Sequence, residues 1–361
     1  MKIHTFVTET TNPEQRGHQA GERWAPEIHE TAARYLGYYP RVGIAAEQAR
    51  AIGEASQSQL EAWCPDLAAE VAAMAEGARL PLWQLACVNA RTEILATKPP
   101  APEGECSTAV HAPQGTRAPR SIQTWDWVGT LAPHGLMLQL TTRRGVTVKQ
   151  FTEFGMLGKI GVNSAGLGLH FNILHHASDN GAGGVPVHAI ARRLLEEAAT
   201  VDEAIDLARS APVSASTVLT VFARNASPAS GLRAASIELS PSGLAVIPPR
   251  PDGWVLHTNH YLDAGLSQGE RAPGTSSTWA RLDHLKTAVA NMNAHDLRSR
   301  AEAMCGSAGA NAPVCVHPDL NQPDTEHWET LLTIGIDTEG CTLDYAAGNP
   351  QTLATMGSAR F

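Results

Sequence analysis

The chain of 361 residues carries 27 Lys and Arg against 36 Asp and Glu, which gives a formal net charge of −9, and 43% of its residues are hydrophobic. This length suffices to bury a large core without disulfides or metal ions. The acidic balance and the lack of a basic stripe argue against a nucleic-acid binder, which must neutralise phosphates. The longest uncharged run, residues 160–178, contains histidines and asparagines, so no transmembrane helix is expected.

The N-terminal sequence and the spacing of the cysteines restrict the location of the protein and the kinds of site to expect. The N-terminal residues show neither the apolar core nor the cleavage site of a secretory signal, so a cytoplasmic location is expected. The cysteines form no CxxC pair and no Cys/His zinc spacing, which predicts neither a disulfide framework nor a structural zinc site. No cofactor is expected, and at least one thiol is a candidate for chemistry. The six cysteines are Cys64, Cys87, Cys106, Cys305, Cys315 and Cys341.

The first part of the chain is predicted to be helical and the next part to form strands. Alanine-rich amphipathic stretches predict helices throughout residues 14–95, and Pro81 stands where a helix start tolerates proline. Adjacent prolines within residues 97–105 forbid continued helix. The sheet is expected to begin at Cys106, because β-branched and aromatic residues become frequent beyond it. Strands are predicted within residues 135–142, 145–155 and 159–174.

The second half alternates blocks of helix and strand. Helices are predicted over residues 187–210, followed by a strand at 216–223 and a hairpin over 235–249. Two further helices are expected between Thr278 and Cys305, and two alternating strands within 329–348 end the pattern. Such blocks predict antiparallel sheets packed by helices, an α+β class, rather than a parallel sheet.

Three segments could carry chemistry. Cys106 follows a Pro/Gly-rich loop and begins a predicted strand, although an inert buried cysteine is the alternative. Asp126 lies between Trp125 and Trp127, so it either faces solvent at a strand end or belongs to a polar site, since an unpaired buried carboxylate is costly. The glycine-rich stretch that ends at Asn172 lets backbone approach a ligand, but it lacks the GxGxxG dinucleotide pattern.

The segment His257-Thr-Asn-His260 is a fourth candidate. A metal site would use both histidines, but neither an HExxH pattern nor a suitably spaced acidic residue accompanies them. A metal ion is therefore not predicted. Asn259 offers an amide donor instead.

Several stretches in this order resemble the acyl-coenzyme A:6-aminopenicillanic-acid acyltransferase family, which are cysteine-type N-terminal nucleophile (Ntn) hydrolases. No single stretch is specific, but the ordered set is, and it spans nearly the whole chain. The stretches are residues 89–93 (NARTE), 105–109 (ECSTA), 123–127 (QTWDW), 161–168 (GVNSAGLG), 258–260 (TNH), 276–281 (SSTWAR) and 314–318 (VCVHP), with the terminal hairpin.

The resemblance implies a fold and a maturation step. The fold is the αββα four-layer sandwich, here with a helical N-terminal segment. An inactive precursor would cut itself between Glu105 and Cys106. An α chain of residues 1–105 would stay associated with a β chain of residues 106–361, as a heterodimer that can assemble further.

The resemblance also implies roles for individual residues. The new α-amine of Cys106 titrates near ~7.7–8.0 and a thiol near ~8.5, so the amine can accept the thiol proton. Asn259 is the candidate oxyanion donor, and Asn172 matches an asparagine that related hydrolases use. Asp126 is expected to bind the α-amine. Arg281 is expected to lower the thiol pKa or to orient Asp126, with a helix-surface ion pair as the alternative.

These inferences predict a cysteine amidohydrolase or acyltransferase that acts on a small N-acylated amine or amino-acid-like compound. Hydrolysis and acyl transfer share one acyl-enzyme and stay open, and the resemblance also allows an acyl-coenzyme A donor. Gln123 stands where bile-salt hydrolases have arginine, so a bile-salt substrate is not expected, and Glu105 replaces the glycine that often precedes the nucleophile. The alternatives are an unprocessed, non-catalytic Ntn-fold binding protein and a metal-dependent hydrolase.

Overall fold

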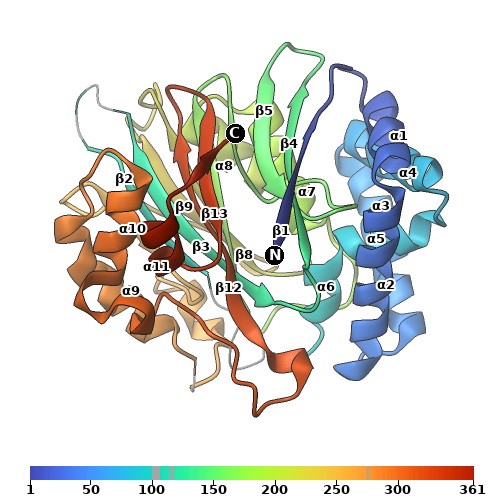
Figure 1. Ribbon diagram of the computed structural model, residues 1–361. Coiled ribbons are helices and arrows are strands. Elements are labelled where there is room, and N and C mark those ends of the chain that lie inside the picture. The colour runs from blue at the N-terminus through green and yellow to red at the C-terminus, as the bar shows by residue number, and fades with distance from the viewer. Residues whose placement is uncertain (100–105, 114, 116–117, 275) are drawn as a thin grey trace.

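Two β-sheets lie face to face in the computed structural model, which describes residues 1–99, 106–113, 115, 118–274 and 276–361. Helices cover the outer side of each sheet, so that the chain is arranged in four layers (Figure 1). The predicted α+β class and the αββα arrangement are confirmed.

The first sheet has eight strands in the order β1-β4-β5-β6-β7-β8-β9-β10. All its neighbouring strands are antiparallel except β1 and β4, which are parallel. Its strands are β1 (Lys2–Val7), β4 (His134–Thr141), β5 (Thr147–Thr152), β6 (Ile160–Asn163), β7 (Leu167–Ile173), β8 (Thr217–Ala223), β9 (Ala234–Ser240) and β10 (Gly243–Ile247).

The second sheet has six strands in the order β11-β2-β3-β12-β13-β14, and all of its pairs are antiparallel. The predicted hairpins β9–β10 and β12–β13 both form. The strands of this sheet are β2 (Ser107–His111), β3 (Arg120–Val128), β11 (Trp254–His257), β12 (Trp328–Asp337), β13 (Thr342–Ala347) and β14 (Ala359–Arg360).

Ten of the described helices fall into three groups. The helices α1 to α6 lie on the side of β1 and β4, α7 and α8 pack on the first sheet, and α9 and α10 pack on the second (Figure 1). Their bounds are α1 (Pro13–Arg23), α2 (Ala25–Arg41), α3 (Ala46–Trp63), α4 (Pro65–Ala78), α5 (Leu82–Asn89), α6 (Arg91–Leu95), α7 (Val187–Glu197), α8 (Val201–Arg209), α9 (Thr278–Ala288), α10 (Leu297–Cys305) and α11 (Pro350–Met356).

Local sequence explains where several helices begin. Asn12 accepts a hydrogen bond from the Gln15 amide and is followed by proline, so α1 starts at a favoured cap. Thr200 and Glu203 form a capping box that starts α8. These signals fix the ends of elements, whereas burial of the apolar faces holds the layers together.

The expectation that the sheet begins at Cys106 was wrong. Residues Lys2–Val7 already form β1, which pairs with β4 at the register Lys2↔His134. A six-residue edge strand is hard to identify from sequence, because its pattern is short and the strand that pairs with it is distant in the chain. The first quarter of the chain is thus helical only from Pro13 onward, and its strand is an edge of the first sheet.

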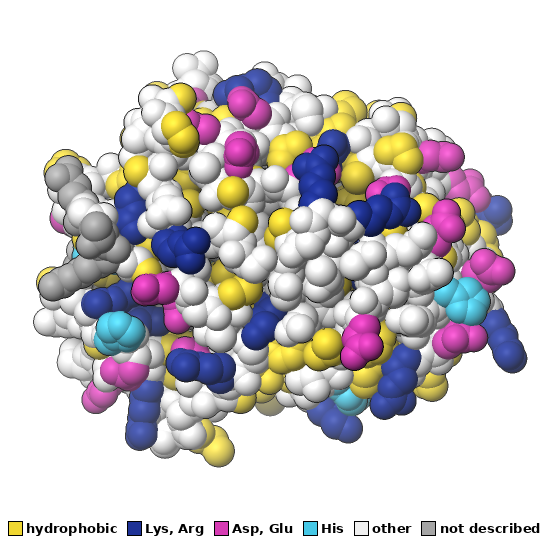
Figure 2. All heavy atoms as spheres, turned by 90° about the horizontal axis from the view of Figure 1, so that it is seen from above, with side chains coloured by type: hydrophobic (Ala, Val, Ile, Leu, Met, Phe, Trp, Pro, Cys, Tyr) yellow, Lys and Arg dark blue, Asp and Glu magenta, His cyan; other side chains and the backbone are white. Residues whose placement is uncertain are grey.

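Two further features are the apolarity of the helices and the distribution of charge on the surface. Within the described part of the chain no helix combines the length and apolarity needed to cross a bilayer. Figure 2 shows one face of the molecule, on which basic and acidic side chains are interspersed rather than gathered into a stripe of one sign.

Candidate active site

Cys106 stands directly before β2, and its side chain is buried with 5% exposure. Its Sγ lies 4.0 Å from the carbonyl oxygen of Asp126 on the neighbouring strand β3. Glu105, the other residue of the predicted cleavage site, lies outside the described residues. The structure therefore places the candidate thiol at the end of a central strand of the second sheet.

The carbonyl oxygen of Cys106 accepts two strong side-chain hydrogen bonds. Arg281 Nη1 donates to it at 2.7 Å from helix α9, and Asn172 Nδ2 donates at 3.0 Å from strand β7. Arg281 Nη1 also donates to Ser107 Oγ at 2.9 Å. Because Arg281 is completely buried, the helix-surface ion pair considered from the sequence is wrong. Two layers of the fold thus fix the peptide unit that follows the thiol.

Asn172 links the two sheets. Its Oδ1 accepts from Thr108 Oγ1 on β2 at 2.7 Å and from Gln123 Nε2 on β3 at 3.3 Å. Gln123 Nε2 also donates to the Phe171 carbonyl oxygen at 2.5 Å. Both ends of the Asn172 amide are therefore engaged by neighbours of Cys106.

Asn259 follows strand β11 and faces a cavity. Its Oδ1 accepts from Arg281 Nη2 at 3.2 Å, and its Nδ2 donates to the Ile173 carbonyl oxygen at 2.8 Å. Its backbone amide donates to Thr278 Oγ1 at 2.8 Å, which ties the segment to the start of α9. The amide has a second N–H, which has no acceptor among the described residues and can therefore serve a further one.

Asp126 is buried with 1% exposure, so it does not face solvent at a strand end. Burial raises the pKa of the Cys106 thiol to about 12, and the Asp126 carboxylate contributes to that rise. Arg281 and Lys159 act in the opposite direction and lower the pKa of the thiol. The thiol is therefore surrounded by charges of both signs.

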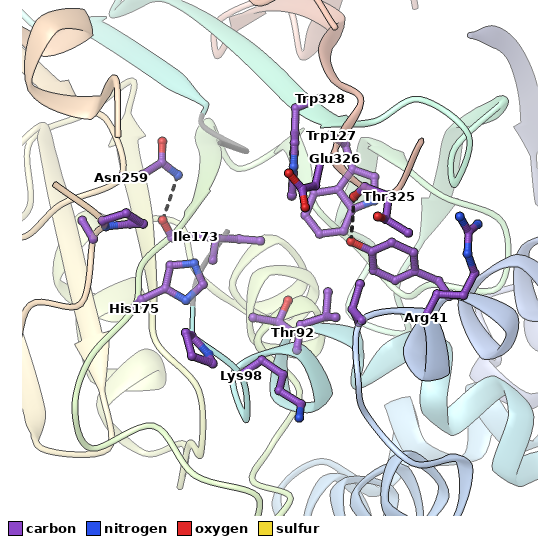
Figure 3. Close-up of a pocket in the computed structure, with 16 residues that line it drawn as sticks. Arg41, Thr92, Lys98, Trp127, Ile173, His175, Asn259, Thr325, Glu326 and Trp328 are labelled. Atoms are coloured by element: carbon purple, nitrogen blue, oxygen red, sulfur yellow. Dashed lines mark hydrogen bonds between the residues drawn. The ribbon is translucent and has the colours of Figure 1, made fainter. Parts of the chain in front are cut away.

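A cavity of about 310 Å³ lies beside Asn259. Figure 3 shows Asn259, Ile173 and His175 on one side of it and Trp127, Trp328 and Arg41 on another. The walls are largely apolar and aromatic, and charged groups such as Lys98 and Glu326 also contribute. A space of this size admits a small organic group.

Sequence reasoning assigned no role to a buried charged cluster that lies near Cys106. This Glu153 cluster consists of Arg91, Glu153, Lys159 and Tyr35, and the side chains of its three charged members are at most 1% exposed. Arg91 belongs to a stretch that carries the family resemblance. A lysine directly before a buried strand is the signal that could have drawn attention to Lys159.

The two histidines of the candidate metal segment have separate partners. His257 Nε2 lies 2.8 Å from Glu238 Oε1, whereas His260 Nδ1 lies 2.9 Å from Thr278 Oγ1. No group of three or more His, Cys, Asp or Glu side chains is placed to hold a metal ion in the ranges that the structure describes.

The sequence of this chain is similar to a known family and to a curated relative. Residues 115–352 match the family described as acyl-coenzyme A:6-aminopenicillanic acid acyl-transferase, so Cys106 lies just outside the matched residues. The 40 kDa form of the acyl-coenzyme A:6-aminopenicillanic-acid-acyltransferase of Emericella nidulans is 28% identical over 246 residues, which cover 66% of this chain. This chain spans 65% of the length of that curated relative.

Two solved structures have a partly similar chain trace. Penicillin V acylase from Agrobacterium tumefaciens has a TM-score of 0.45 and 16% identity, over 67% of this chain and 83% of that one. The N-acylethanolamine-hydrolyzing acid amidase ortholog of Caenorhabditis elegans has a TM-score of 0.44 and 15% identity, over 65% of this chain and 93% of that one.

Proposed function

This chain belongs to the acyl-coenzyme A:6-aminopenicillanic acid acyl-transferase family, and from that premise we propose that it transfers or hydrolyses an acyl group through an acyl-enzyme on Cys106. The observation that carries the proposal is the convergence of distant residues on Cys106. Arg281 and Asn172 both donate hydrogen bonds to its carbonyl oxygen. Asn259 accepts a hydrogen bond from Arg281 and also lines the cavity.

Maturation supplies the catalytic base. The Cys106 thiol adds to the Glu105 carbonyl carbon, the peptide C–N bond breaks, and water hydrolyses the resulting thioester. The freed α-amine then has a titration range near ~7.7–8.0 and can accept the thiol proton. Asp126, buried on the adjacent strand, is the carboxylate that would orient this amine.

Catalysis then proceeds in two halves. The thiolate adds to the acyl carbonyl carbon of the substrate, and the α-ammonium group protonates the leaving amine or thiol as its bond to carbon breaks. Water or an amine resolves the acyl-enzyme in the second half. The second N–H of Asn259 Nδ2 is the donor for the oxyanion, because this side chain lines the cavity. Asn172 acts by holding Cys106 in place.

Contacts across the proposed cleavage site support an α chain that stays bound. Strand β1 pairs with β4 over six residues, so the N-terminal segment completes the first sheet. Arg91 Nη1 lies 3.0 Å from Glu153 Oε1, and Arg16 and Arg192 share the Glu70 carboxylate. Residues 1–105 and 106–361 are therefore proposed to form a heterodimer after processing.

The substrate is proposed to be a small N-acylated amine or amino-acid-like compound, consistent with a cavity of about 310 Å³ and mostly apolar walls. The family also permits an acyl-coenzyme A donor. Which nucleophile reaches the acyl-enzyme decides between transfer and hydrolysis. A cytoplasmic location accompanies this proposal.

The test is the intact mass under denaturing conditions, with N-terminal sequencing of each chain. We expect two chains, the second of which begins at Cys106, and we expect Cys106→Ala to remain a single chain without turnover. Cys341→Ala is the matched control, because Cys341 lies on the terminal hairpin turn and should process normally. A single inactive wild-type chain would instead favour the unprocessed binding protein, and turnover by Cys106→Ala would contradict the nucleophile assignment.

A further inference from the structure

Two cations share one carboxylate in the Glu153 cluster. Lys159 Nζ is ion-paired with Glu153 Oε1, and Arg91 Nη1 lies 3.0 Å from the same oxygen. The other carboxylate oxygen, Oε2, accepts from Tyr35 OH at 2.5 Å. Both oxygens are thus occupied, and a protonated Lys159 leaves the cluster with one positive charge in excess.

At neutral pH the described titratable groups around the cluster do not remove this excess. Burial raises the pKa of Glu93, a neighbour of Arg91, to about 8, so this carboxyl is largely neutral there. Burial raises the pKa of Tyr35 well above its ordinary value, so the phenol stays neutral. His188 Nε2 lies 3.3 Å from Arg91 Nε, and burial together with the two cations keeps the pKa of His188 far below its ordinary range. Burial, with a contribution from Arg91, lowers the pKa of Lys159 to about 7. A buried cation without a counter-charge is costly, which explains this shift.

The geometry places Cys106 beside Lys159. The β2–β3 register ends at Ser107↔Thr124, and extending its alternation by one residue puts Cys106 on the face of Trp125, because opposite residues of an antiparallel pair share a face. Lys159 Nζ lies 3.8 Å from the centroid of the Trp125 ring. On the same face, Thr108 hydrogen-bonds Asn172 of β7, so this face points into the space between the sheets.

We infer that Lys159 is a positioning residue for the Cys106 thiolate: its ammonium balances the thiolate, and the thiolate supplies the anion that the Glu153 cluster lacks. The inference rests on the proposed function, in which Cys106 is the nucleophile. When the thiol ionises, its proton passes to the α-amine and Lys159 keeps its own. The other charged groups that face Cys106 are Asp126 on β3 and Arg281 on α9, which have opposite signs.

This arrangement assigns different tasks to the two cations near the thiol. Arg281 holds the Cys106 carbonyl oxygen by a hydrogen bond and comes from the helical layer outside the second sheet. Lys159 lies directly before β6 of the first sheet and acts through charge alone, since it makes no hydrogen bond to the sulfur among the contacts that the structure describes. Its charge also lowers the pKa of the thiol, which supports this role.

The test is the rate at which iodoacetamide alkylates Cys106, followed by mass spectrometry of the Cys106 peptide from about pH 5 to about pH 10. The thiolate displaces iodide, so the rate reports the thiolate fraction. Wild type, Lys159→Met, Glu153→Gln and Arg143→Met are compared in the same processing state. Arg143 is the matched control, because it is an exposed cation paired with Asp66 on the surface.

We expect Lys159→Met to move the profile about one pH unit upward, which is roughly a tenfold slower reaction at neutral pH. Glu153→Gln removes a negative charge and should move the profile downward, and Arg143→Met should leave it unchanged. Lys159→Met keeps Glu153 paired with Arg91 and Tyr35, so the fold should survive.

Opposite shifts of the two cluster variants separate a charge effect from a structural one. A loosened core would speed alkylation at every pH in both variants without moving either midpoint. An unchanged Lys159→Met profile, or shifts of both variants in one direction, would overturn the inference while leaving the proposed function in place. A wild-type Cys106 that stays unlabelled over the whole range would overturn the proposed function and this inference with it.

Discussion

Two buried ionic clusters join the N-terminal helices to the rest of the chain, and they differ in charge balance. The Glu70 cluster contains Arg16, Arg192, Glu70 and Glu196, two cations and two carboxylates. The Glu153 cluster has two cations and one carboxylate. The balanced cluster is complete in itself and lies between helices, whereas the unbalanced one borders Cys106. The Glu70 cluster is therefore structural, whereas the Glu153 cluster has an excess positive charge that a further anion can balance.

The largest expected effect is on the balanced cluster. Glu70→Ala would leave Arg16 and Arg192 buried without their shared carboxylate, and breaking such a pair costs about 3–5 kcal/mol. Urea unfolding measures this loss. Glu76→Ala, an exposed change on the same helix, is the control and should alter the free energy of unfolding by no more than about 0.5 kcal/mol. Equal losses in both variants would refute the structural role of the cluster.

A second prediction concerns the site that the unbalanced cluster borders. Asn259→Ala should lower kcat by about 10²–10³-fold, equivalent to about 2.7–4 kcal/mol, because the oxyanion loses a donor. Steady-state kinetics with a turned-over N-acyl amine measures the effect, alongside urea unfolding. A raised KM at unchanged kcat would show that Asn259 binds the ground state instead and would contradict the oxyanion role.

The third prediction is a gradual change of stability with pH, small for each pH unit, that distinguishes the clusters. While the Cys106 thiol is protonated, the pKa of Lys159 is about 7 in the folded chain, against ~10.4 when unfolded. Between these values the unfolded chain binds more protons, so the contribution of Lys159 to stability rises with pH, by at most about 1.4 kcal/mol per unit. The difference in free energy of unfolding between wild type and Lys159→Met should therefore grow in favour of wild type from about pH 7 to about pH 10.

The carboxylates behave in the opposite range. The pKa values of Glu70 and Glu153 are lowered, by the neighbouring arginines and, for Glu153, also by Lys159, although burial opposes this effect. Their stabilisation is present above the unfolded value of ~4.3 and is lost as the pH falls through the folded values.

The lysine prediction has its own contradicting outcome. If the difference in free energy of unfolding between wild type and Lys159→Met stays flat in the alkaline range, Lys159 is not an uncompensated buried cation.

Much of the fold could be predicted from local pattern. The helices between Pro13 and Leu95, the hairpins β9–β10 and β12–β13, and helices α9 and α10 all follow from hydrophobic period, caps and turns. Strand β1 could not be predicted, because β4, with which it pairs, lies about 130 residues away and an edge strand has a weak pattern. Ordered motifs likewise pointed to Cys106, Asp126, Asn172, Asn259 and Arg281, but not to how they meet.

The sequence by itself determined the class of the chain, the positions of most helices and the family to which it belongs, since these depend on periodicity and on motifs in order. Only the tertiary structure decided which side chains contact Cys106. Arg281 and Asn172 reach one carbonyl oxygen from residues far apart in the chain, and Lys159 gains its low pKa from burial beside Arg91. Charge balance and desolvation depend on what is packed nearby, and neighbours in space are not written in local sequence.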